Sequence, residues 1–228
     1  MFKPADLFDL SQTEHARVFD GCGNAWDALK TLKQYIEANL RPALHHRCEG
    51  KAFIGANVFI GEGTVVEDGA MIKGPAIIGK NCQIRHGAYI RDNVLIGDNC
   101  VIGNSSEIKH SILFNGSQAP HFNYVGDSIL GHKAHLGAGV KISNVKLVPG
   151  NIFVEMEGVP VDTGLRKFGA LLGDFVEIGC NSVLNPGSII GRNSILYPNT
   201  NWRSILPDNM IVKDRSAQEI VPRRLRET

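Results

Sequence analysis

The residues best suited to chemistry gather in one short stretch, QAPHFNYVGDS, which runs from residue 118 to residue 128. His121 lies near its middle, and because a histidine side chain titrates close to neutral pH, it can accept a proton from an amine or hydroxyl nucleophile. Tyr124 follows three residues later, where its hydroxyl could donate a hydrogen bond to developing negative charge. The stretch therefore predicts a general base, His121, with a hydrogen-bond donor beside it.

Two basic residues upstream suggest an anion-binding group. Arg91 and Lys109 are separated in the sequence by three units of a six-residue repeat. If three units make one full turn of the chain, the two side chains stack on one face and can clamp a phosphate. The simpler interpretation, in which each is an ordinary surface charge, stays open.

A six-residue repeat surrounds these residues. Its in-phase positions hold aliphatic or aromatic residues, and a small residue usually follows four places later. The in-phase residues are Ile54, Ile60, Val66, Ile72, Ile78, Ile84, Ile90, Ile96, Ile102, Ile108 and Phe114. Period six differs from the 3.6-residue period of a helix and from the alternation of a two-sided strand. With Gly and Asn to form the corners, it predicts an all-β fold, a parallel β-helix in which each coil has three short faces.

The repeat is interrupted twice. Its phase is lost between Phe114 and Leu130, whose separation falls two positions short of three repeat units, and it disappears again from Leu147 to Ala170. One resumed coil separates the two breaks, with in-phase residues Leu130, Leu136 and Ile142. The last coils follow the second break, with in-phase residues Leu172, Ile178, Leu184, Ile190, Leu196 and Trp202. We expect the second break, about residues 148–169, to be a loop or hairpin that leaves the β-helix. Because loops on a rigid scaffold often form sites, we expect the chemistry between the breaks.

Three regions follow from this pattern: residues 1–48, residues 49–206 and residues 207–228. The first lacks the repeat and is predicted to be helical, with a capping-box spacing from Ser11 to Glu14 that predicts a helix to about Phe19. A second helix should follow Asn24 and end before Pro42. We expect these helices to form a cap over the open first coil, since repeat arrays need their ends covered; an adaptor or oligomer element is the alternative. The last region reads as a strand, MIVKD, and a short helix.

Composition narrows the class of protein. The net charge is +1 with acidic and basic residues interleaved, so no nucleic-acid or membrane partner is expected. No apolar run approaches the ~20 residues of a membrane span, and no signal-peptide pattern is present, which predicts a soluble cytoplasmic protein. Five cysteines without a CxxC motif argue against a disulfide scaffold. Cys82 and Cys100 are three repeat units apart, so we expect them to stack as small buried fillers.

Residues 101–139, VIGNSSEIKHSILFNGSQAPHFNYVGDSILGHKAHLGAG, resemble the acetyltransferase half of the bifunctional enzymes that make UDP-N-acetylglucosamine. The resemblance is strongest to archaeal-type sugar-phosphate nucleotidyltransferases, whose chains also carry a stretch similar to VDTGLRKFGALLGD, and it covers roughly residues 53 to 205. It implies a left-handed β-helix, a homotrimer with active sites between subunits, and acetyl-CoA as the acyl donor. The implied acceptor is a small-molecule amino-sugar phosphate or a nucleotide-linked amino sugar.

The resemblance also implies roles for single residues. His121 matches the base that deprotonates the sugar amine. The residues that match positions holding the sugar phosphate or positioning the acetyl group are Arg91, Lys109, Tyr124 and Asn144, and those that match the CoA channel are Ala138 and Cys180. Two positions depart from the pattern: His135 replaces an active-site asparagine two residues before GAG, and a substrate lysine aligns with Gly169, with Lys167 nearby.

A further departure concerns the first half of those enzymes. Their nucleotidyltransferase domain carries a GxGxRM loop that cradles a triphosphate, and this sequence has no such motif. We therefore expect no pyrophosphorylase activity. Whether a separate nucleotidyltransferase docks on the N-terminal helix is left open by the sequence.

Zinc chemistry is a competing hypothesis, because some hexapeptide β-helices are γ-class carbonic anhydrases with three histidines around zinc. The histidines of the repeat region are His86, His110, His121, His132 and His135. The HxxxxH spacing of that family is missing, since His132 and His135 are three residues apart, so no metal site is predicted. Acyl transfer from acyl-carrier protein and a non-catalytic β-helix scaffold also stay open.

Overall fold

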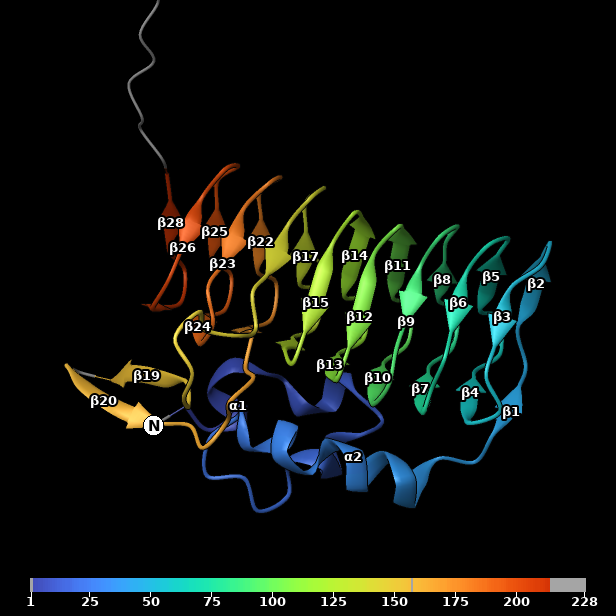
Figure 1. Cartoon of the computed structure of the whole chain (residues 1–228), viewed down its shortest axis with the longest axis horizontal. Helices are drawn as coiled ribbons and strands as arrows, with labels where there is room; N and C mark the ends of the chain where they lie inside the picture. The colour runs from blue at the N-terminus through green and yellow to red at the C-terminus, as the bar shows by residue number, and fades with distance from the viewer. Residues whose placement is uncertain (1, 157, 214–228) are drawn as a thin grey trace, which may run out of the picture.

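A computed structural model describes residues 2–156 and 158–213, and three parallel sheets form a prism along most of this length (Figure 1). Sheets A and B have nine strands each and sheet C has eight. The chain visits them in the order C, A, B, so that each coil adds one strand to every sheet. Many neighbouring strands are three repeat units apart in the sequence, as in the pairing of Val58 with Ala76 and of Ala76 with Val94, and others are one or two residues closer.

The strands are short and their bounds follow the repeat. Sheet A contains β1 (Ala43–Leu44), β4 (Val58–Ile60), β7 (Ala76–Ile78), β10 (Val94–Ile96), β13 (Ser111–Leu113), β16 (Ile129–Leu130), β21 (Ala170–Leu172), β24 (Ser188–Ile190) and β27 (Ile205–Leu206). Sheet B contains β2 (Arg47–Glu49), β5 (Val65–Glu67), β8 (Gln83–Ile84), β11 (Val101–Asn104), β14 (Gln118–His121), β17 (His135–Leu136), β22 (Glu177–Ile178), β25 (Ile195–Leu196) and β28 (Ile211–Val212). Sheet C contains β3 (Phe53–Ile54), β6 (Met71–Ile72), β9 (Tyr89–Ile90), β12 (Glu107–Lys109), β15 (Tyr124–Gly126), β18 (Lys141–Ile142), β23 (Val183–Leu184) and β26 (Asn201–Trp202).

The prism winds in the left-handed sense. In Figure 1 the strands of sheet C run downward on the near side and those of sheet B run upward on the far side, while the coils advance from right to left. The corners use left-handed backbone conformations, and asparagine is the usual residue there: φ is 53° at Asn81, 56° at Asn93 and 57° at Asn99. The predicted left-handed parallel β-helix is confirmed.

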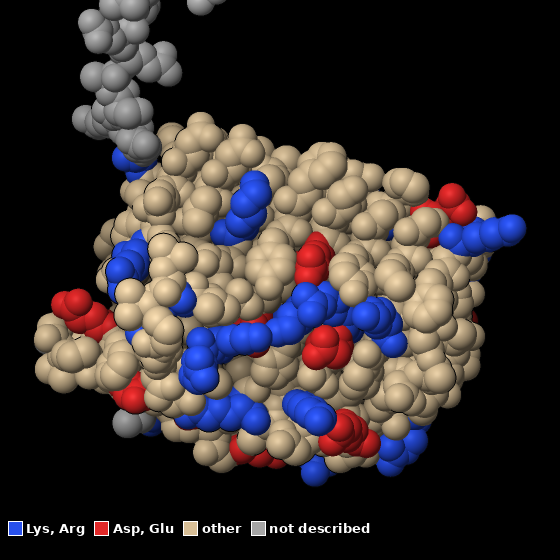
Figure 2. All heavy atoms as spheres, viewed as in Figure 1, with Lys and Arg blue, Asp and Glu red and all other residues tan. Residues whose placement is uncertain are grey.

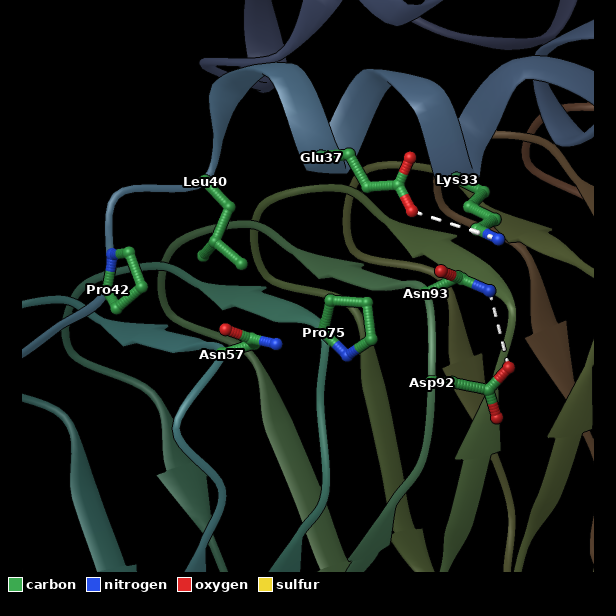
Figure 3. Close-up of a pocket in the computed structure, with 8 residues that line it drawn as sticks. All are labelled: Lys33, Glu37, Leu40, Pro42, Asn57, Pro75, Asp92 and Asn93. Atoms are coloured by element: carbon green, nitrogen blue, oxygen red, sulfur yellow. Dashed lines mark hydrogen bonds and ion pairs between the residues drawn. The ribbon is translucent and has the colours of Figure 1, made fainter.

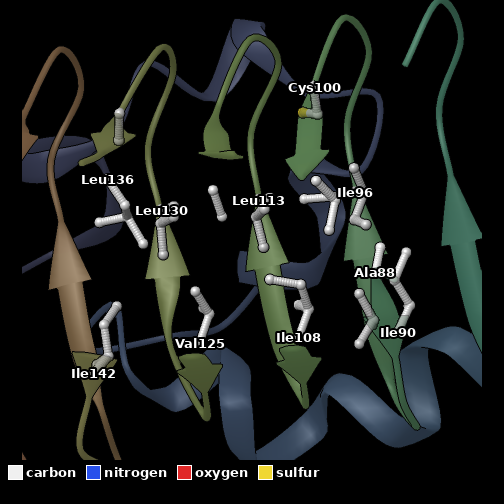
Figure 4. Close-up of a cluster of buried hydrophobic side chains, with 14 of the residues drawn as sticks. Ala88, Ile90, Ile96, Cys100, Ile108, Leu113, Val125, Leu130, Leu136 and Ile142 are labelled. Atoms are coloured by element: carbon white, nitrogen blue, oxygen red, sulfur yellow. The ribbon is translucent and has the colours of Figure 1, made fainter. Parts of the chain in front are cut away.

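The interior is a column of stacked aliphatic side chains (Figure 4). Cys82 and Cys100 lie inside it, 1% and 0% exposed, as expected of small fillers. One in-phase prediction is wrong: Leu113, not Phe114, occupies the interior position. The coil from Val94 to Ser111 is one residue shorter than the coil before it, so the phase changes one coil earlier than the sequence indicated.

Phe114 instead faces outward and packs against the N-terminal segment, with its ring 5.0 Å from that of Phe8. This segment contains α1 (Pro4–Leu7), the 3-10 turns η1 (Leu10–Gln12) and η2 (Ala16–Phe19), and α2 (Asp27–Asn39). The continuous helix predicted to reach Phe19 is therefore wrong. Polar side chains bind nearby backbone instead: Asp9 accepts from the Ser11 N–H and Thr13 accepts from the His15 N–H.

The helical segment covers sheet A and does not close the first coil, so its predicted position is wrong. In Figure 1, α2 lies along the underside of the prism beneath the strands of sheet A. The outward positions of sheet A are apolar and buried under the segment, and they are Ile77, Leu95, Ile112, Ile129, Leu171 and Ile189. The first coil begins at Ala43, inside the range predicted to be helical. Fully burying one such side chain contributes about 1.5–3 kcal/mol, which is why this sheet needs a cover.

The second interruption is an antiparallel hairpin of β19 (Phe153–Met156) and β20 (Val159–Asp162). It lies between two coils that stack directly, since Lys141 pairs with Val183. Its base packs near α2, where the Phe168 ring lies 6.1 Å from that of Trp26. No helix among the described residues is long and apolar enough to cross a membrane. The short helix expected at the C-terminus lies outside the described residues.

Candidate functional site

Sheet C presents a row of basic side chains at the same position in successive coils. The Lys73 N–H donates to the Ile90 carbonyl and the Arg91 N–H to the Ile108 carbonyl, so Lys73, Arg91 and Lys109 follow one another along the prism. We call these three residues the basic row. Figure 2, in the view of Figure 1, shows Lys and Arg side chains in a line across this face with acidic side chains beside them. The sequence had indicated Arg91 and Lys109 but missed Lys73.

A buried carboxylate, Asp127, anchors one end of the row. Its oxygens lie 3.5 Å from Lys109 Nζ and 2.8 Å from His110 Nδ1, and Asn144 donates its side-chain amide to the same carboxylate. Burial alone would raise the pKa of Asp127, but the hydrogen bonds from His110 and Asn144 and the charge of Lys109 outweigh it and lower the pKa. Asp127 therefore holds Lys109 and Asn144 in place as a charged group.

Tyr124 lies against Asn144 over a glycine. A Cβ at Gly126 would be 2.8 Å from Tyr124 Oη and 2.7 Å from Asn144 Nδ2, so only glycine leaves room for both side chains. Burial raises the pKa of Tyr124, and the negative charge of Glu107 adds to the effect. The phenol is therefore neutral near pH 7 and can donate a hydrogen bond.

Arg91 is held by Glu107, whose Oε1 accepts from Arg91 Nη1 at 2.8 Å. This hydrogen bond raises the pKa of Arg91. The guanidinium also lies 6.0 Å from the centre of the Tyr89 ring. Because a guanidinium has five N–H donors, Arg91 keeps several for an anion.

His121 lies at the end of β14, on the edge between sheets B and C. Its backbone is fixed, since its N–H donates to Asn123 Oδ1 at 3.0 Å and its carbonyl accepts from the Gly139 N–H at 3.0 Å. The buried Asn123 in turn donates to the Gly137 carbonyl at 2.8 Å. The imidazole itself is exposed, and within residues 2–156 and 158–213 it makes no side-chain hydrogen bond, so none links it to Tyr124 or Lys109.

The two residues matched to the CoA channel continue this edge. The Gly139 N–H bonds the His121 carbonyl, and the Asn181 N–H bonds the Ala138 carbonyl at 2.9 Å. His121, Ala138 and Cys180 therefore occupy successive coils along the edge between sheets B and C. Cys180 is exposed and Ala138 is half-buried, so this edge is open to solvent.

Of the other two predicted substrate residues, His135 lies on another sheet and Lys167 lies one residue from a backbone hydrogen bond to Asn144. His135 is on sheet B, where its Nδ1 lies 2.8 Å from Glu177 Oε2. Lys167 is exposed, beside Phe168, whose N–H donates to the Asn144 carbonyl at 3.0 Å. Gly169 is buried against Ser128 and the Gly126 carbonyl, which leaves no space for a lysine side chain there.

The sequence interpretation missed the partners of these residues because it kept the full three-unit spacing up to Phe114 and placed the whole shortfall of two positions between Phe114 and Leu130. His110, Asp127 and Asn144 stack at one corner with separations one position shorter than three units, as do Glu107 and Tyr124. The early phase change at Leu113 was the signal that could have revealed them. In the part of the chain that the structure describes, no three His, Cys, Asp or Glu side chains are grouped to hold a metal ion.

The six-residue repeat and the left-handed prism together define this chain as a hexapeptide-repeat β-helix protein. A family profile described as the GMPPB C-terminal domain matches residues 72–165, and one for the hexapeptide repeat of succinyl-transferase matches residues 49–74. The chain resembles the acetyltransferase half of the bifunctional GlmU proteins, being 37% identical to GlmU of Methanococcus maripaludis over 202 residues. That match covers 89% of this chain and 49% of the relative.

A second relative is the bifunctional sugar-1-phosphate nucleotidylyltransferase/acetyltransferase of Sulfurisphaera tokodaii, 36% identical over 88 residues, or 39% of this chain and 22% of the relative. The chain thus spans at most about half the length of these curated relatives. Among solved structures, the UDP-N-acetylglucosamine acyltransferase of Arabidopsis aligns with a TM-score of 0.44 and 14% identity, over 74% of this chain and 67% of the other.

Proposed function

We propose that this protein transfers an acetyl group from acetyl-CoA to the amine of an amino-sugar phosphate or nucleotide-linked amino sugar. The observation that supports this most is the gathering of Arg91, Lys109, Tyr124 and Asn144 on one strip of sheet C. These residues come from four different coils, and the sequence resemblance to the GlmU-type enzymes implies a substrate-binding role for each of them. Their contacts with Glu107, Asp127 and one another hold the strip in a fixed geometry.

Each side chain has a role in the proposed reaction. Arg91 and Lys109 bind the acceptor phosphate, and Tyr124 and Asn144 donate hydrogen bonds to the sugar or to the reacting carbonyl. His121 takes a proton from the sugar amine as the amine nitrogen forms a bond to the acetyl carbon. The carbon–sulfur bond then breaks, and the departing thiolate recovers the proton from His121. Acetyl-CoA supplies the activated acyl group and would lie along the edge lined by Ala138 and Cys180.

The proposed site lies on an assembly interface. Sheet A is covered by the chain's own N-terminal segment, so only sheets B and C are left for neighbouring copies. His121 lies on the edge between those two sheets, and we therefore place the active site between subunits of a homotrimer. A neighbour would bring further groups, such as His135 on sheet B or Lys167 beside the hairpin, toward the strip on sheet C.

The test is release of CoA thiol from acetyl-CoA with a panel of amino sugars, amino-sugar 1-phosphates and nucleotide-linked amino sugars. We expect turnover with a phosphorylated amino sugar, and His121→Ala should lower kcat by ~10²–10⁴-fold, as for loss of a general base. His86→Ala is the matched control, because His86 is an exposed histidine just after β8, in an earlier coil. Wild-type turnover in His121→Ala would refute the assigned mechanism. If no acceptor in the panel caused thiol release, the result would favour acyl transfer from acyl-carrier protein, zinc chemistry or a non-catalytic scaffold role.

A further inference from the structure

The basic row extends beyond the residues needed for a single phosphate. Arg91 and Lys109 each face a carboxylate, Glu107 and Asp127 respectively. Lys73, one coil before Arg91, is exposed and has no ion pair among the residues the structure describes. Its Nζ lies 6.0 Å from the centre of the Tyr89 ring, which Arg91 approaches at the same distance. The least neutralised charge of the row is therefore at the end farthest from Tyr124.

Lys73 and Arg91 have a spacing that suits two linked phosphates. They occupy the same position in neighbouring coils, and strands of adjacent coils are about 4.8 Å apart. Both side chains flank one aromatic ring, which restricts them to the same side of the sheet. With Lys109 at the next position, the row offers three cations in succession, which is one more than the pair that binds a single phosphate, and the additional cation, Lys73, can bind a second, linked phosphate.

A cavity of about 500 Å³ opens directly around the corner from these two residues. Asp92 and Asn93 follow Arg91 in the chain, and Pro75 lies two residues after Lys73. Figure 3 shows that the opposite wall comes from α2 and the segment after it, with Leu40 and Pro42 facing the corner. The volume falls within the range of small-molecule sites. The lining is mixed: Lys33, Glu37, Asn57, Asp92 and Asn93 are polar or charged, while Leu40, Pro42 and Pro75 form an apolar part against which a planar ring can pack.

One polar atom in this cavity lacks a partner. Asn93 Oδ1 is buried and accepts no hydrogen bond, while Asn93 Nδ2 lies 3.3 Å from Asp92 Oδ2. In Figure 3 the nitrogen of Asn93 is directed toward Asp92 and the oxygen toward the other side, where the cavity lies. A buried acceptor without a donor is unfavourable, so a turn of the Asn93 side chain that brings Oδ1 to a ligand N–H group in the cavity would satisfy it. Nucleobases present such groups on a planar ring.

We propose that this cavity and the step from Lys73 to Arg91 bind the nucleoside diphosphate portion of a nucleotide-linked amino sugar. The base lies against Leu40, Pro42 and Pro75 and donates to Asn93 Oδ1, and the diphosphate lies on Lys73 and Arg91. The sugar then extends along the row toward Lys109 and Tyr124. This inference rests on the proposed function and makes its acceptor a nucleotide sugar in preference to a sugar monophosphate.

Calorimetric titration with UDP, GDP, ADP and dTDP tests the site without requiring turnover. We expect one of them to bind the wild-type chain, and Lys73→Met or Asn93→Ala to weaken that binding by about tenfold or more, as for loss of a charge-assisted or buried hydrogen bond. Lys51→Met is the control, because Lys51 is an exposed lysine at another edge. In kinetics, Lys73→Met should raise KM for the nucleotide-linked acceptor and leave KM for the amino-sugar 1-phosphate unchanged.

The outcomes separate this inference from the proposed function. If no diphosphate binds while an amino-sugar 1-phosphate is acetylated, the inference is overturned and the proposed function stands. If a diphosphate binds through Lys73 and Asn93 but no acceptor is acetylated, the nucleotide site is supported and the acetyltransferase assignment fails. Binding that is equally strong in Lys73→Met, Asn93→Ala and Lys51→Met would overturn the inference as well.

Discussion

Asp127→Asn removes the charge that three neighbouring side chains face, and we expect it to destabilise the fold strongly. The side chain of Asp127 is 4% exposed and that of Lys109 is 15% exposed. Without the carboxylate, the Lys109 ammonium stays largely buried with no counter-ion, and the new amide places a second NH₂ group near Lys109 and Asn144. Removing one partner of a buried ion pair costs about 3–5 kcal/mol. Because Lys109 keeps some contact with water, we expect about 3 kcal/mol.

Glu107→Gln is the matched control for this change. Glu107 also pairs with a cation on sheet C, and its 2.8 Å contact with Arg91 is shorter than the 3.5 Å contact of Asp127 with Lys109. Its side chain is 32% exposed, however, and that of Arg91 is 35% exposed. Pairs with such access to water contribute about 0–1 kcal/mol. The comparison therefore separates the effect of burial from the effect of distance.

Urea unfolding followed by circular dichroism at pH 7 gives the free energy of unfolding for each variant, provided that the slope with denaturant is unchanged. Adding Lys109→Met to Asp127→Asn should restore part of the lost stability, because the buried charge without a partner is then removed. The reasoning would be refuted if Asp127→Asn lost less than Glu107→Gln, or if Lys109→Met made the Asp127→Asn variant still less stable.

The same variant predicts a change at low pH. The pKa of Asp127 is lowered in the folded protein, since its hydrogen bonds and the charge of Lys109 outweigh the effect of burial. A lowered carboxyl pKa gives stability that is present above the pKa of the unfolded chain and is lost as pH falls through the folded pKa. Asp127→Asn should therefore flatten the decrease in stability below about pH 4. If Asp127→Asn lost stability at low pH as steeply as the wild-type protein, other carboxylates would be the cause of that loss.

Two further changes test other parts of the structure. Gly126→Ala places a methyl group against Tyr124 Oη and Asn144 Nδ2. Both atoms are ends of side chains that can shift, so we expect a stable protein whose KM for the acceptor, measured by steady-state kinetics, rises by roughly tenfold. An unchanged KM would place both side chains outside the site. Burial lowers the pKa of His15, whose Nδ1 lies 3.0 Å from Tyr35 Oη. Below about pH 6.5 the unfolded chain therefore binds more protons than the folded protein, and the free energy of unfolding should fall as the pH drops. Thermal unfolding at pH 7.5 and 5.5 measures this, and His15→Gln should reduce the difference; an equal difference in that variant would exclude His15 as its source.

The β-helix was readable from the sequence because its contacts are made between neighbouring coils. A residue one repeat unit further along the sequence faces the same interior, and a residue three units further lies directly above it in the next coil. The position of a residue in the prism can therefore be predicted from its spacing alone, without knowledge of distant segments. Arg91 and Lys109 were placed in this way, as were Cys82 and Cys100. His121 and Tyr124 were recognised from their residue types and from the resemblance. The residues that surround them in the fold could not be predicted from spacing.

The position of the N-terminal helices was not readable in the same way. The pairs Ile77–Ile78, Leu95–Ile96 and Ile112–Leu113 each put one aliphatic residue inside the prism and the other outside it. Such pairs show that sheet A needs a cover. They do not identify the segment that supplies it, because any amphipathic helix would bury the same surface.

By itself, the sequence determined the repeat, the stacked rows and the residue types that could do chemistry, since each depends on fixed spacing along the chain. Only the tertiary structure decided which groups meet. Two successive coils that are each one residue short shift the register, so that Asp127 lies beside both Lys109 and Asn144 and Phe114 turns outward. A shift of one residue changes every later side-chain position, and its effect on packing and charge pairing depends on neighbours that are distant in the sequence.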